Sequence, residues 1–153
     1  MATTVAHAAS KVGQEQLLAS TTFPHGSLLA TLVHILDAEC GWRVLLQRGK
    51  ETPALDVKDF PTLASLDDRW RYEEGHMRQY LASLTDESLM DVVRYTNPQG
   101  IHRERIRWHG LYHVVNHGTQ HRSEAAAMLT DYGQSPGDMD FSLYLIEILR
   151  RSG

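Results

Sequence analysis

The stretch from Ser27 to Gln47, SLLATLVHILDAECGWRVLLQ, contains no proline and repeats its apolar residues at helical spacing. Ser27 is a candidate N-cap, and Gly49 stands where a helix commonly stops. We therefore predict a long helix over Ser27 to Gln47. Its apolar positions are Leu28, Leu32, Ile35, Cys40, Trp42, Leu45 and Leu46.

Two further long stretches predict helices on the same grounds. One begins at Ser65, where Asp68 completes a start that resembles a capping box, and runs to about Leu84. The other spans roughly Ile106 to Tyr132 and stops at Gly133. The tryptophans occupy core-like positions in these helices and are predicted to be buried: Trp42, Trp70 and Trp108.

The remaining segments are shorter. A final helix is expected over about Asp140 to Arg150, while Thr3 to Ser20 is compatible with a helix but short of large apolar residues. We predict a connecting loop over Lys50 to Ala64, and an extended excursion or hairpin over Asp91 to Arg107. We predict an all-α, up-and-down four-helix bundle with a short first helix and a short C-terminal helix, forming a single domain over residues 1–153.

Composition narrows the function classes. The 153 residues include 15 Lys and Arg against 19 Asp and Glu, a net charge of −4 that argues against nucleic acid as a partner. No stretch approaches the roughly 20 apolar residues of a membrane-spanning helix, so no membrane partner is expected. No signal peptide is visible, and Cys40 is a single cysteine, so we predict a cytoplasmic protein.

Histidine is the unusual residue type, with nine in the chain. His117 and His121 are four residues apart, so on a helix they point the same way and can converge on one transition-metal ion. His34 is the candidate third ligand, because Ala30, Ala38 and Gly41 keep its face of the helix free of large side chains. Three histidines would leave a coordination position open, as in catalytic sites.

Less specific interpretations of these histidines stay open. A His-x-x-x-His pair is often solvent-exposed, and a single core histidine is often only hydrogen-bonded. Asp37, Glu39 and Glu124 are candidate supporting carboxylates or general bases, although each is more often a surface residue. His113 could line the edge of the site. We interpret three further histidines as surface residues: His76, His102 and His109. We expect His7 and His25 to lie outside any cluster, and Cys40 to be a buried, inert thiol.

The chain resembles the DinB/YfiT-like family of four-helix-bundle proteins, from about residue 24 to the end. The resemblance rests on SLLATLVHILDAE (27–39), the turn YTNPQG (95–100) and, most specifically, HVVNHGTQHR (113–122). It implies that His34, His117 and His121 bind a divalent ion, nickel or zinc. It also implies activities such as those of thiol-dependent S-transferases and isomerases, in which the metal activates a thiolate.

Two features depart from the family pattern. Arg122-Ser123-Glu124 replaces the frequent Arg-Gly-Gln, and little chain precedes Lys11, where the family's first helix is usually already long. A truncated first helix, a misassigned start or a partner subunit would each account for the second feature, and an exposed apolar groove would favour a homodimer.

We therefore hypothesise a metal-dependent S-transferase that acts on a small-molecule thiol and an electrophilic substrate. The alternatives are a non-enzymatic metal-binding protein of the stress or DNA-damage response, and a metal-dependent hydrolase. Substrate, thiol and native metal are not specified by the sequence.

Overall fold

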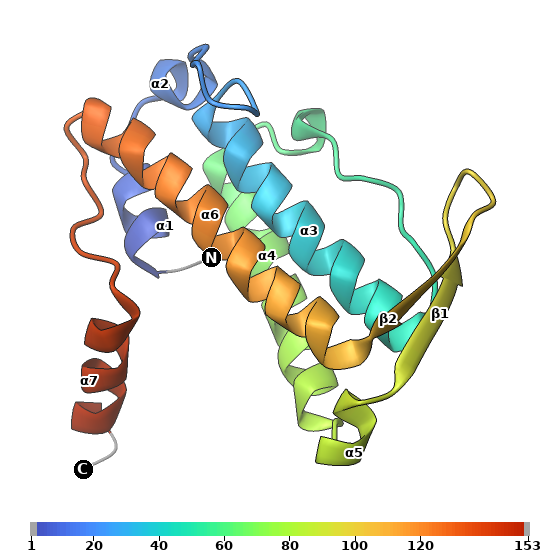
Figure 1. The fold of residues 1–153 in the computed structure, drawn as a ribbon. Helices are drawn as coiled ribbons and strands as arrows, with labels where there is room; N and C mark the ends of the chain where they lie inside the picture. Colours follow the sequence, from blue (N-terminus) through green and yellow to red (C-terminus); the bar gives the residue numbers. More distant parts are fainter. Residues whose placement is uncertain (1–2, 152–153) are drawn as a thin grey trace.

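The computed structural model describes residues 3–151 and is built mainly from helices (Figure 1). The prediction of an all-α bundle with a short first helix and a short C-terminal helix is confirmed. None of the helices in the described part of the chain is long and apolar enough to cross a membrane. The helices are α1 (Thr3–Ala9), α2 (Gln14–Leu18), α3 (Leu28–Arg48), η1 (Val57–Asp59), α4 (Leu63–Ala82), α5 (Asp86–Leu89), α6 (Arg107–Asp131) and α7 (Phe141–Arg151).

The helix directions do not alternate as an up-and-down order would require. Trp70 of α4 donates to Glu39 of α3 over 2.8 Å, and four residues further along α3 Arg43 reaches Glu73 over 2.9 Å. Because the contacts advance along both helices together, α3 and α4 run parallel. The connection over residues 49–62 returns to the starting end of α3, whereas α6 lies beside α3 in the opposite direction (Figure 1).

Local hydrogen bonds define the helix starts. Ser27 Oγ accepts from the Ala30 amide over 3.2 Å, which confirms the predicted cap of α3. For α4 the predicted start at Ser65 with Asp68 is wrong. Thr62 is the N-cap: its hydroxyl accepts from the Ser65 amide, and Ser65 Oγ accepts from the Thr62 amide in return. Ser65 therefore completes a cap that begins three residues earlier.

The main core lies between α1, α3, α4 and α6. Its fully buried large side chains include Val5, Leu32, Leu36, Leu66, Met128 and Leu129. Trp70 is buried and Trp42 is half-buried, but Trp108 is 42% exposed, so its predicted burial is wrong. Trp108 is two residues, or about 200° around a helix, from the buried Gly110 and therefore points to the opposite face.

A hairpin leads the chain into α6, as the sequence predicted. β1 (Val92–Thr96) pairs antiparallel with β2 (His102–Ile106), with Val92 opposite Ile106. Val93 of β1 is buried beside Leu46 of α3, so the hairpin is fixed to the bundle at its base. This attachment sets where α6 begins, and with it the position of the histidines that α6 carries.

The end of α3 depends on a glycine. Gly49 adopts φ +64° as the C-cap, and a Cβ there would lie 2.9 Å from the carbonyl oxygen of Arg94 in β1. We expect Gly49→Ala to lower the free energy of unfolding by about 2–3 kcal/mol, through the left-handed backbone and the collision together. Gly100→Ala is the control, because Gly100 has φ +77° with open space around it. Urea unfolding followed by circular dichroism measures both, and equal losses would contradict a role for the β1 contact.

Candidate metal centre

His34, His117 and His121 lie together between α3 and α6. The ring centroids of His117 and His121, one turn apart on α6, are 4.4 Å apart, and those of His34 are 4.8 Å and 4.7 Å from these two rings. The Nε2 atoms of His34 and His117 are only 3.0 Å apart. The rings of the three predicted ligands therefore lie close together, whereas the set whose candidate ligand atoms all lie within 4.8 Å of one another is His25, His34 and His121.

The helix pairing explains this convergence. α3 and α6 pack side by side, and Gly110 on the buried face of α6 allows close approach of α3. A Cβ on Gly110 would lie 2.6 Å from Leu46 of α3. A Cβ on Gly118 would meet the guanidinium of Arg122, which covers it. The missing side chain at Gly110 lets the two helices lie close together, and imidazoles from both helices come into contact.

His25 also belongs to the cluster, and the prediction that it lies outside any cluster is wrong. Its ring stacks on that of His34 with centroids 3.8 Å apart and lies edge-on to His121 at 5.0 Å. The candidate ligand atoms of His25, His34 and His121 all lie within 4.8 Å of one another. His25 precedes the cap of α3 in a loop, where helical periodicity says nothing about direction. The only available signal was its closeness to the start of the helix that carries His34.

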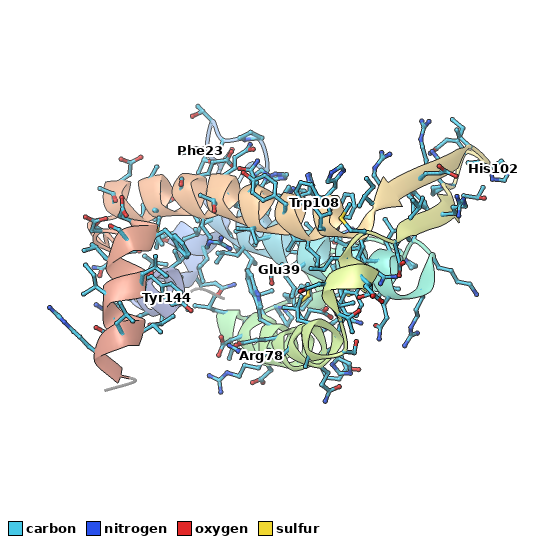
Figure 2. All side chains as sticks on the ribbon, turned by 60° about the horizontal axis from the view of Figure 1, so that its bottom comes forward. Phe23, Glu39, Arg78, His102, Trp108 and Tyr144 are labelled. Carbon is cyan, nitrogen blue, oxygen red and sulfur yellow. The ribbon has the colours of Figure 1, made fainter. Side chains whose placement is uncertain are left out.

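One of the three candidate carboxylates supports the site. Glu124 Oε2 lies 2.7 Å from His121 Nδ1, and a bond donated by Nδ1 leaves Nε2 of that ring free to bind a metal. Asp37 instead accepts from the amide of Leu55 and holds the connection to α4. Glu39 accepts from the Trp70 indole, and Figure 2 shows it directed into the space between α6 and α4.

The remaining candidates lie outside the cluster. His113 is exposed, and its ring centroid is 5.6 Å from His117 and 4.7 Å from Trp42, so it stands at the edge as predicted. Cys40 is buried against α4, where Arg69 donates to its sulfur over 3.5 Å. Burial raises the pKa of the Cys40 thiol, which agrees with the prediction of a buried thiol away from the histidines.

The electrostatics disfavour the charged forms of three of these imidazoles, His25, His34 and His117. Burial, followed by repulsion from His121 and His34, lowers the pKa of His117 to about 4. Burial likewise lowers the pKa of His34 and of His25. Burial alone would raise the pKa of Glu124, but hydrogen bonds from His121 and Gln120 outweigh it, and the net shift is downward. At neutral pH His25, His34 and His117 thus offer neutral nitrogen donors beside the Glu124 carboxylate.

These donors fit a divalent transition metal. Two nitrogens that bind one ion at about 2.0–2.1 Å can be at most about 4.2 Å apart. The 3.0 Å between His34 and His117 satisfies that limit. The candidate ligand atoms of His25, His34 and His121 lie within 4.8 Å of one another, about 0.6 Å more than this limit. Small side-chain rotations can close that difference. Neutral imidazoles are the usual ligands of zinc, nickel and copper.

A pH dependence follows from the lowered pKa values. The unfolded chain binds protons at imidazole near pH 6.5, whereas folded His117 does so only near 4. Between these values the unfolded state binds more protons, so the stability of the metal-free protein should fall as the pH drops from 7 to 5. Urea midpoints after chelator treatment measure this fall. His117→Ala should flatten it, and an unchanged slope in that variant would contradict the assignment.

Comparison with known proteins identifies the family to which the chain belongs. No curated protein matches the chain. The model of the DinB family matches residues 2–148. The match includes α1, the histidine cluster and most of α7. The chain therefore belongs to the DinB family.

Proposed function

We propose that this protein is a divalent-metal-dependent enzyme that transfers a low-molecular-weight thiol to an electrophilic substrate. The observation that carries the proposal is the convergence of neutral imidazoles from α3 and α6, with His34 and His117 only half-buried. His34, His117 and His121 would hold the ion, nickel or zinc, and Glu124 would orient His121. When bound, the ion supplies the positive charge that lowers the pKa of a thiol.

The thiol must come from a substrate. Cys40 is the chain's one cysteine, and it is buried against Arg69 of α4 with a raised pKa. In the proposed reaction the external thiol loses its proton, and its sulfur forms a bond to an electrophilic carbon. The leaving group departs with the electron pair of the broken bond and takes up a proton, so that a thioether and a protonated leaving group are formed.

Activity measurements on tag-free protein test the proposal. The protein is loaded with nickel or zinc and incubated with a panel of small thiols and electrophiles, and thioether products are measured by mass spectrometry. We expect turnover that chelation abolishes and that His34→Ala lacks. If chelation melts the fold and neither thiol transfer nor hydrolysis is found, the non-enzymatic alternative is supported instead. Water activation at the same site is the hydrolase alternative.

We further propose a cytoplasmic homodimer in which α7 docks on a second copy. α7 has eleven residues, fewer than an isolated helix needs for stability in water. Six of its large apolar side chains are 44–73% exposed, or about 500 Å² per copy. Each α7 would also bury about the same area on the copy that it contacts. The two α7 contacts of a dimer would then bury about 2,000 Å² in total, which is enough for a stable dimer. The six are Phe141, Leu143, Tyr144, Leu145, Ile146 and Leu149.

Sedimentation tests this arrangement. We expect wild-type protein to sediment as a dimer and the double variant Phe141→Ser with Leu149→Ser as a monomer. The control pair is Met90→Ser with Val92→Ser, exposed apolar residues near the hairpin, which should leave the dimer intact. A monomeric wild type, or a dimer that survives the α7 changes, would overturn the proposal.

A further inference from the structure

His25 differs from the other three clustered histidines in where it comes from. It lies in the loop between α2 and α3, over residues 19–27, whereas the others are carried by α3 and α6. It also lies outside the pattern of one histidine on α3 and a spaced pair on α6. Its ring nevertheless makes the shortest centroid contact of the cluster, 3.8 Å to His34.

The loop holds His25 in a defined place. The Thr21 amide donates to the Gly26 carbonyl over 2.7 Å, and the Gly26 amide donates to the Phe23 carbonyl over 2.9 Å. The Phe23 amide also donates to the Thr21 hydroxyl. Gly26 adopts φ +79°, which turns the chain immediately before the Ser27 cap of α3. The turn places the imidazole over α3, and three hydrogen bonds fix the loop that carries it, so little conformational entropy remains to be lost on binding.

Two interpretations of this position differ in chemistry. In the first, His25 is an aromatic ring that packs on His34 and does not bind metal. In the second, a ring nitrogen of His25 binds the ion that His34 binds. The second is favoured because its ligand atom lies within 4.8 Å of those of both His34 and His121, and because no carboxylate or backbone partner competes for it in the described hydrogen bonds.

We propose that His25 is a fourth imidazole ligand of the metal centre, supplied by the α2–α3 loop; this inference rests on the metal centre of the proposed function. Four protein ligands fill a tetrahedral zinc site, whereas an ion that accepts five or six ligands keeps room for a substrate thiol. The donor set therefore favours nickel over zinc for a centre that also binds substrate.

Binding measurements on metal-free protein test the inference. His25→Phe keeps an aromatic ring over His34 but removes both nitrogens. We expect it to weaken nickel binding by at least about 10-fold in calorimetric titrations, the least that a group supporting a metal centre contributes. His113→Phe is the matched control and should retain wild-type affinity, because His113 lies at the edge of the cluster. Thermal melts in chelator establish that both variants fold.

A spectroscopic count completes the test. With Cu²⁺ as the probe, the electron paramagnetic resonance spectrum should show coupling to four nitrogens in wild-type protein and to three in His25→Phe. Unchanged nickel affinity in His25→Phe, or three nitrogens in both proteins, would overturn the inference. Neither measurement uses thiol transfer. A chain with four nitrogen ligands and no transferase activity would refute the proposed function alone, and one with three nitrogen ligands and full activity would refute His25 alone.

Discussion

His34→Ala and His121→Ala should each lose at least about 100-fold in affinity for a divalent ion, since each removes a ligand from a centre where even supporting groups contribute 10–100-fold. His34 is the only one of the three predicted ligands that α3 supplies, so its loss separates the ion from that helix. Elemental analysis of protein purified without a histidine tag measures retained metal, and calorimetry measures affinity.

A matched control lies on the same helix. His109 of α6 is exposed, and its ring contacts Trp108 at 4.1 Å rather than the cluster. His109→Ala should retain wild-type metal content. Wild-type stoichiometry in both His34→Ala and His121→Ala would refute the ligand assignment, whereas its loss in all three variants would point to general unfolding, which melting curves detect.

Glu73→Gln should destabilise the fold by about 3–5 kcal/mol, the usual consequence of breaking a buried ion pair. Glu73 of α4 is only 1% exposed and accepts two bonds from Arg43 of α3, from Nε and, over 2.9 Å, from Nη2. The hydrogen bond to Glu73 raises the pKa of Arg43. The amide of glutamine is neutral, so the arginine charge would stay buried without its counter-charge.

The next residue of α4 supplies the control. Glu74 is exposed and pairs with Arg78 one turn along, so Glu74→Gln should change the free energy of unfolding by less than about 0.5 kcal/mol. Should Glu73→Gln fail to fold, the double variant Arg43→Met with Glu73→Leu should recover most of the stability, because it removes both charges. Equal urea midpoints for Glu73→Gln and Glu74→Gln would contradict this account.

Local signals in the sequence were sufficient for most elements of the fold. The cap at Ser27, the stop at Gly49 and the hairpin before α6 each depend on neighbouring residues, and all three predictions are confirmed. The parallel pairing of α3 and α4 was missed because it depends on the path of residues 49–62. Fourteen residues can extend over about 45 Å, more than the roughly 32 Å length of α3, so this connection is long enough to cross back along that helix.

The site residues, too, could be predicted only where the signal is local. The spacing of His117 and His121 places both on one face of α6 whatever the fold, and the small residues around His34 marked a face open to close approach. His25 could not be assigned because a loop has no fixed periodicity. The sequence also could not show that Glu124, rather than Asp37 or Glu39, bonds a cluster histidine. That depends on which neighbour each carboxylate contacts in the folded chain.

The contact between α3 and α6 joins parts of the chain that are far apart, since His34 and His117 are 83 positions apart. An ion shared by these two side chains would act as a reversible cross-link across more than half of the polypeptide. At a free ion concentration 100 times its dissociation constant, the folded form would gain about 2.7 kcal/mol. Turnover of the protein by proteases would then follow the cell's supply of that ion, with the unliganded form degraded first.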